Sequence, residues 1–170
     1  MGTKRILPLA VVSALLMVMA VSCGPKSNDA SDGKEFEDYK MAFTDTLKFD
    51  LNLADDTVEG NFRLEVKHTD EYPFDNIWLK VTYGSFDDNG EPIVKSMAYD
   101  LNLADSNGEW IGFGTAGQYE TESKPRRIKI NPAVPLTIRQ VGEVDTLNGV
   151  IRVGFTFLGD KKVEEQKDSE

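Results

Sequence analysis

The chain has 170 residues, of which 19 are basic and 29 are acidic, giving a formal charge of −10. This acidic balance argues against nucleic acid as a partner, because nucleic-acid binding requires basic patches. With a single cysteine the chain cannot form an intramolecular disulfide, so a hydrophobic core must hold the fold unaided.

Residues 1–22 carry the three parts of a secretory signal. Lys4 and Arg5 form a basic start, and an almost unbroken apolar run follows over residues 6–21. Small or β-branched residues then stand directly before Cys23, the single cysteine. The apolar run has 16 residues and falls short of the ~20 that span a bilayer.

Cleavage in front of a cysteine is typical of bacterial lipoproteins, in which the thiol and the new amine carry acyl chains such as palmitate. Each buried methylene of such a chain contributes roughly 0.8 kcal/mol of membrane affinity. We therefore expect Cys23 to be the lipidation site and to bind the protein to membrane lipid. An uncleaved transmembrane anchor and a plain signal peptide followed by a free thiol are the alternatives.

The rest of the chain is expected to hold one folded domain between two polar segments. Residues 24–35 have no apolar side chain larger than alanine, so residues 23–35 are predicted to be the lipidated cysteine and a flexible tether. Residues 159–170 are similarly polar and are predicted to be a disordered tail. The domain is therefore predicted over residues 36–158.

Inside this domain the dominant hydrophobic period is two. Apolar and polar residues alternate in seven segments, at residues 47–53, 62–66, 77–83, 97–103, 128–130, 134–138 and 151–157. Such alternation marks half-buried strands, and polar Asn-Gly turns separate several of them. The prediction is an all-β domain, an antiparallel β-sandwich of about seven to nine strands, with an open barrel as the alternative.

His68 is the only histidine and is predicted to lie in a loop between two strands, beside Asp70 and Glu71. One histidine cannot build a His-based zinc site, and no G-x-S-x-G nucleophile motif accompanies it. The favoured interpretation is a loop histidine bonded to a nearby carboxylate or backbone group, and a hydrolase is the alternative. We expect no catalytic residue, no metal ligand and no cofactor.

Two acidic turns, at residues 87–91 and 105–109, share the pattern D-x-N-G-E. Calcium takes six to eight oxygen ligands, and neither turn has the length or spacing of a full calcium loop. Hairpin turns are enriched in the same residues for backbone reasons. Turn formation is therefore the favoured interpretation, and calcium binding is the alternative.

Aromatic side chains gather at two places. Tyr72, Phe74 and Trp78 surround a proline at the start of a predicted strand, and Trp110 follows the second acidic turn in a glycine-rich segment. The favoured interpretation is that these rings fill the ends of the core. The alternative is an exposed rim of these four residues that binds another protein or a sugar.

Three stretches, together with the signal segment, resemble one family. They are HTDEYPFDNIWLKV at 68–81, NGEWIGFG at 107–114 and VDTLNGVIRVGF at 144–155. Together they resemble the gliding-motility lipoproteins of the GldH family. The resemblance implies a membrane lipoprotein needed for surface motility, with no enzymatic activity, and the one residue that it transfers is Cys23, as the acylation site.

These observations predict a non-enzymatic, membrane-anchored lipoprotein of the cell envelope, placed in the outer membrane and facing the periplasm. Its expected partners are membrane lipid, through acylated Cys23, and other envelope proteins, with no nucleic acid. The expected role is that of a component of a gliding-motility-type protein assembly. A lipid-anchored module that binds a glycan or calcium is the alternative.

Overall fold

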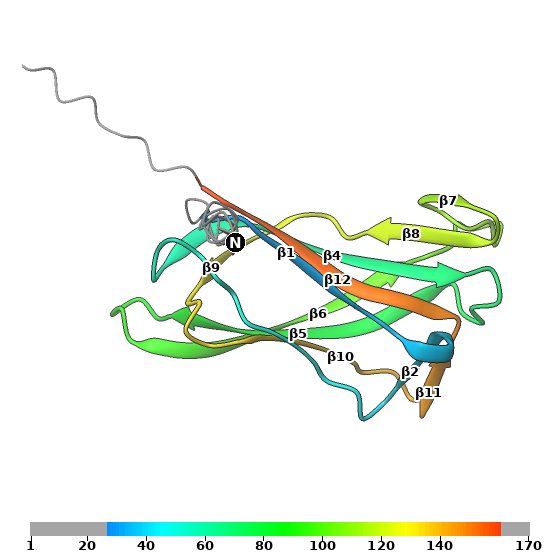
Figure 1. Ribbon diagram of the computed structural model, residues 1–170, viewed down its shortest axis with the longest axis horizontal. Helices are drawn as coiled ribbons and strands as arrows, with labels where there is room; N and C mark the ends of the chain where they lie inside the picture. Colours follow the sequence, from blue (N-terminus) through cyan, green and yellow to red (C-terminus); the bar gives the residue numbers. More distant parts are fainter. Residues whose placement is uncertain (1–26, 161–170) are drawn as a thin grey trace, which may run out of the picture.

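The computed structural model describes residues 27–160. Twelve strands form two main antiparallel sheets that pack face to face, with a separate pair of short strands at one end (Figure 1). The predicted all-β antiparallel sandwich is confirmed. The strand count exceeds the predicted seven to nine because five strands have no counterpart among the seven alternating segments, and three of these five have only three residues each.

The larger sheet has six strands, the smaller sheet has four, and two short strands pair on their own. The larger sheet contains β1 (Ala30–Glu35), β12 (Val150–Gly159), β4 (Val58–Thr69), β8 (Gln118–Glu122) and β7 (Phe113–Thr115) in this order, with β9 (Arg126–Ile130) also paired to β4. The smaller sheet contains β3 (Leu47–Phe49), β10 (Leu136–Gln140), β5 (Asn76–Phe86) and β6 (Pro92–Asn102). The separate pair is β2 (Lys40–Ala42) with β11 (Thr146–Asn148).

Helical structure in the described part of the chain is limited to η1 (Glu37–Tyr39), a single 3₁₀ turn between β1 and β2. Across residues 27–160, no helix combines the length and the apolar character that crossing a membrane requires.

The period-two pattern forms the core directly, because successive strand residues point to opposite faces of a sheet. In β5, Ile77, Leu79 and Val81 are buried between the two sheets, whereas Trp78 on the opposite face is 48% exposed. Burial of each such aliphatic side chain contributes roughly 1.5–3 kcal/mol. The alternation seen in the sequence therefore predicts correctly which face of each long strand is buried.

Three phenylalanine rings fill the centre of the sandwich. Phe155 of β12 stacks on Phe62 of β4 with ring centroids 5.7 Å apart, and it meets Phe49 of β3 edge-on at 5.2 Å. Phe49 belongs to the smaller sheet and the other two rings to the larger one. Aromatic pairs of this kind stabilise a core beyond the area that they bury, so this cluster joins the two layers.

The first strand lies where the sequence predicts a tether. All six residues of β1 pair with β12, with Ala30 opposite Phe157 at one end of the pairing. The tether prediction is therefore wrong for residues 30–35, and the folded domain begins before residue 36. The cause is that β1 is an edge strand held mainly by main-chain hydrogen bonds, which require no apolar alternation.

The two ends of the sandwich differ in what they carry. The end where the described chain begins and finishes is called the proximal end, and the opposite end, with the β2–β11 pair and the β7–β8 hairpin, is called the distal end (Figure 1). At the proximal end the Gly159 N–H donates to the Asp29 carboxylate at 3.0 Å, and the Asn28 amide donates to Asp55 at 2.9 Å. At roughly 3.3 Å per residue, the 12 residues of β4 span about 40 Å between the ends.

Candidate functional site

The distal end carries a groove of about 490 Å³, which we call the distal groove. It lies between the loop that joins β4 to β5 and the loop that joins β10 to β11. Its lining includes three of the four aromatic residues of the predicted rim, Tyr72, Phe74 and Trp78. Residues 140–144 and Leu147 form the other wall. A volume of this size is typical of sites that bind small molecules or a few side chains of a partner.

The first wall of the distal groove is formed by the loop before β5 and the start of that strand, and Tyr72 is its buried residue. Its side chain is 3% exposed, and its hydroxyl donates to the carbonyl of Asn76 at 3.1 Å, which closes the loop at the start of β5. Burial raises the pKa of the Tyr72 hydroxyl well above its ordinary value, so this group stays protonated and remains a donor. Phe74 packs edge-on against Tyr72 with centroids 5.8 Å apart and is itself 41% exposed.

Trp78 stands on the outer face of β5, next to this wall. It lies opposite Asp100 of β6, and its carbonyl accepts a hydrogen bond from the Val141 N–H at 3.1 Å. The backbone of the second wall is thereby attached to the strand that carries the indole. Because Phe74 and Trp78 are both about half exposed, the distal groove presents two aromatic faces to its surroundings.

Gln140 adds a buried polar group that the sequence analysis did not identify. The side chain is 0% exposed; its amide nitrogen donates to the Met41 carbonyl at 3.3 Å, and its Oε1 has no hydrogen-bond partner. A buried acceptor without a partner costs about 1–3 kcal/mol. Gln140 follows Leu136 and Ile138 at a spacing of two, so the alternation of β10 places it on the inward face.

Trp110 lies apart from the distal groove. Its ring meets the ring of His68 edge-on with centroids 4.7 Å apart and approaches Tyr119 at 6.2 Å. Trp110 is partly buried and packs against the main core. The structure thus brings Tyr72, Phe74 and Trp78 together, and it places Trp110 in a different cluster.

His68 is not a loop residue, as the sequence analysis expected, because β4 continues through it to Thr69. Its side chain is 0% exposed; Nδ1 lies 2.9 Å from the Thr69 carbonyl oxygen, and Nε2 has no partner. The expectation of a bond to a backbone group is confirmed, and the position in a loop is wrong. The rings of Trp110, Tyr72 and Tyr119 surround the imidazole, so His68 is part of an aromatic packing cluster.

The two acidic turns are explained by their own backbone. The Asp87 carboxylate accepts the N–H groups of Asn89 and Glu91 at 2.9 and 2.8 Å, and Asp105 makes the equivalent bonds in the second turn. These backbone hydrogen bonds, the one from Glu91 above all, hold the pKa of Asp87 below its ordinary value. Among residues 27–160 no three His, Cys, Asp or Glu side chains are grouped as a metal site would require.

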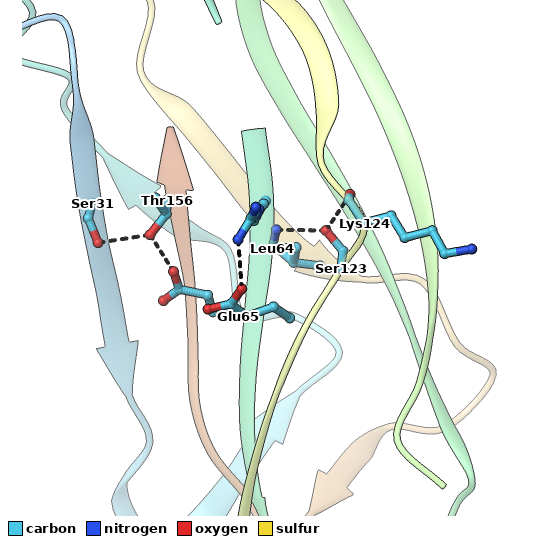
Figure 2. Close-up of polar contacts among 8 residues, drawn as sticks. Ser31, Leu64, Glu65, Ser123, Lys124 and Thr156 are labelled. Atoms are coloured by element: carbon cyan, nitrogen blue, oxygen red, sulfur yellow. Dashed lines mark hydrogen bonds and ion pairs between the residues drawn. The ribbon is translucent and has the colours of Figure 1, made fainter. Parts of the chain in front are cut away.

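A polar network crosses the outer face of the larger sheet. The Thr156 hydroxyl donates to the Glu65 carboxylate and is hydrogen-bonded to the Ser31 hydroxyl, which links β12 to β4 and β1 (Figure 2). Arg152 forms an ion pair with Glu65 at 3.2 Å and lies over Gly33, where a Cβ would be 2.3 Å from the guanidinium carbon. With the guanidinium in this position there is no room for a Cβ at Gly33, and the bond between Ser31 and Thr156 connects β1 to the network.

An all-β sandwich with an open aromatic groove at one end has the form of a binding domain. The family model described as GldH lipoprotein matches residues 31–157, and the chain therefore belongs to the GldH lipoprotein family that its sequence resembles. Membership in this family of gliding-motility lipoproteins implies a lipid anchor in the cell envelope. Cys23, the predicted acylation site, lies outside the described residues.

Other comparisons add little. No curated protein matches the chain. Among solved structures, a chain from "Structure of infectious bursal disease virus Gx strain" is 10% identical over 82% of this chain and 31% of that chain, with a TM-score of 0.26. A likeness of this size carries no argument about fold or function.

Proposed function

We propose that this protein is a non-enzymatic, lipid-anchored component of a cell-envelope protein assembly of the gliding-motility type. In this proposal the distal groove binds another envelope protein. The observation that supports it is the position of two features at opposite ends of the sandwich. The described chain begins at the proximal end (Figure 1), and the residues that line the aromatic groove belong to loops and strands of the distal end.

The link between anchor and domain is short. Cys23 precedes Ser27, the first described residue, by four positions, which reach at most about 14 Å. Asn28 and Asp29 are already bonded to the domain, and β1 begins directly after them. An acyl anchor on Cys23 would therefore hold the proximal end close to the bilayer, nearer than the tether predicted from the sequence.

This geometry points the distal groove away from the membrane. With the proximal end at the bilayer and the strands upright, the groove lies about 40 Å from the lipid surface, the length of β4. An acidic domain has no electrostatic reason to lie flat on anionic lipid. We place the anchor in the outer membrane with the domain in the periplasm, where a groove at this height meets other envelope proteins.

The anchor is tested with Cys23→Ala. Full-length wild type is expected in the membrane fraction, and the variant is expected in the supernatant after the membranes are sedimented. Metabolic labelling with a palmitate analogue should mark the wild type alone. A Cys23→Ala protein that stays membrane-bound and labelled would contradict the lipid anchor.

The assembly role is tested by affinity purification of the tagged full-length chain from native membranes after mild cross-linking. A stoichiometric envelope protein is expected with wild type and is expected to be lost with Trp78→Ala. Phe113→Ala is the matched control, because Phe113 is an aromatic residue of β7 that is 90% exposed and lies outside the distal groove. Recovery of the lipoprotein alone would contradict this role and favour a glycan-binding module, which a glycan array would then test.

A further inference from the structure

The two loops that form the distal groove are acidic. Glu71 and Asp75 belong to the loop before β5, and Glu143 and Asp145 belong to the loop after β10; all four are exposed. In the part of the chain that the structure describes, none of these four carboxylates forms an ion pair. The two loops that form the groove therefore carry four carboxylates without an ion pair among the described residues, and one of them, Glu143, lines the groove.

Among the described residues, no cationic side chain lines the distal groove, and Glu143 supplies a carboxylate. Lys80 and Arg139 lie opposite each other beyond Trp78, and Lys40 lies opposite Asn148, next to Leu147; all three are outside the lining. A ligand with a phosphate or carboxylate would meet the Glu143 charge with no cation in the described lining to compensate it. Anionic ligands are thereby disfavoured.

The side-chain amides of the lining are engaged within the domain. The Asn76 amide nitrogen donates to the Asp100 carboxylate at 2.6 Å. The Gln140 amide nitrogen donates to the Met41 carbonyl at 3.3 Å, and the Gln140 side chain is buried. Neither amide nitrogen is therefore placed to compensate an anionic ligand.

The aromatic side of the distal groove suits a cation with an apolar stem. Tryptophan is the best aromatic partner for a lysine or arginine, and such contacts are strongest where water is excluded. Lysine and arginine also cover apolar surface with their methylene groups while the charged end stays polar. Trp78 and Phe74 offer the faces, and Glu143 offers the carboxylate for the charged end.

We propose that the distal groove binds a segment of its partner protein that carries a lysine or arginine between apolar residues. This inference rests on the proposed function and adds the chemistry of the partner. The apolar side chains pack on Phe74 and Trp78, and the basic side chain pairs with Glu143.

Short peptides test the chemistry. Fluorescently labelled peptides that alternate leucine with lysine, glutamine or glutamate are titrated into the detergent-solubilised lipoprotein, and anisotropy is measured. The lysine peptide is expected to bind best, and higher salt is expected to weaken it. Glu71→Gln/Glu143→Gln should weaken it about three- to tenfold, as expected for two carboxylates near a cation. Binding of the glutamate peptide as tightly as the lysine peptide would overturn the inference.

Controls separate the groove from the general acidity of the domain. Asp88→Asn/Glu91→Gln removes two exposed carboxylates from the hairpin between β5 and β6, outside the distal groove, and should leave affinity unchanged. Trp78→Ala should reduce lysine-peptide binding at least about tenfold. Equal losses in the two double variants, or none in Trp78→Ala, would show non-specific attraction and refute the inference.

The native partner gives an independent readout. The segment of the captured envelope protein that cross-links to the distal groove is mapped by mass spectrometry, and it is expected to contain lysine or arginine beside apolar residues. A segment without a basic residue would refute this inference and leave the proposed assembly role standing. Loss of the partner in Trp78→Ala tests that role separately.

Discussion

The ring of His68 meets the ring of Trp110 edge-on inside the distal end of the sandwich, with centroids 4.7 Å apart. Tyr72 and Tyr119 lie on other sides of the imidazole at 5.6 and 5.7 Å, so the only histidine of the chain is enclosed by aromatic rings. Burial lowers the pKa of His68, and the contact with the Thr69 carbonyl opposes this shift in part. The folded domain therefore prefers the neutral imidazole.

This preference predicts a loss of stability in mild acid. The unfolded chain takes up a proton near pH 6.5, which the folded chain resists, so the free energy of unfolding falls as pH decreases through that value. For one site the slope cannot exceed about 1.4 kcal/mol per pH unit. Urea unfolding at several pH values between about 7.5 and 5.5, the range in which histidine titrates, measures this slope of the free energy of unfolding against pH.

The matched variant is His68→Phe, which keeps a ring in the cluster and removes the titration. Because the chain has no other histidine, this variant should lose the slope between those pH values. An unchanged slope in His68→Phe would show that another group is responsible.

Period-two alternation predicted the core well. It also extends to two buried polar residues: His68, which was predicted to lie in a loop, and Gln140, which was not identified. Phe62, Leu64 and Val66 are followed at the same spacing by His68, and Ile138 is followed by Gln140. Both polar residues occupy inward positions at the distal ends of buried strands. A polar residue that continues an apolar alternation is therefore buried here, and its partners depend on tertiary packing.

The start of the domain could not be predicted from apolar patterning. β1 contributes mainly main-chain hydrogen bonds, and these depend on the position of β12, which is more than a hundred residues further along the chain. The distal groove was predicted only in part. Tyr72, Phe74 and Trp78 are close in sequence, whereas the wall at residues 140–144 comes from a segment whose position only the sheet topology reveals.

Removal of β1 should destabilise the domain. A chain that starts at Phe36 leaves one edge of β12 unpaired, whereas a chain that starts at Ser27 keeps it covered. At about 0.5–1.5 kcal/mol for each backbone hydrogen bond, the loss of six paired residues should cost the shorter chain several kcal/mol of stability and make it aggregate more readily. Thermal unfolding of the two chains at equal concentration compares them, and equal melting temperatures would contradict a structural role for β1.

Gly33→Ala should destabilise the domain through Arg152. A Cβ at Gly33 would stand 2.3 Å from the guanidinium carbon, so the guanidinium must shift, which disturbs its ion pair with Glu65. We expect a cost of about 1–2 kcal/mol by urea unfolding, which should shrink when Arg152 is already replaced by alanine.

Gly154→Ala provides the contrast for this double-mutant cycle. A Cβ at Gly154 would stand 2.7 Å from the Asp32 carbonyl oxygen, a backbone atom that Arg152→Ala does not remove. The cost of Gly154→Ala should therefore persist in the Arg152→Ala background. If Gly33→Ala costs the same in both backgrounds, the close contact with Arg152 does not limit that position.

The two tryptophans should differ in their access to solvent. Trp78 is 48% exposed on the outer face of β5, whereas Trp110 packs against His68 and the core. Acrylamide should therefore quench the fluorescence of Trp78 more strongly. Trp78→Phe should remove most of the quenchable emission and Trp110→Phe should retain it; equal quenching in the two variants would contradict the packing of Trp110.

The position of β12 between β1 and β4 makes the first and last strands of the domain neighbours. A chain exported from its N-terminus presents β1 long before β12 exists to pair with it. We expect a cysteine seven residues before Ala30 to be accessible to acylation before the sandwich is complete. The topology thus requires that the last strand be available before the larger sheet can be completed. A chain that stops before Val150 would be attached but unable to complete its larger sheet.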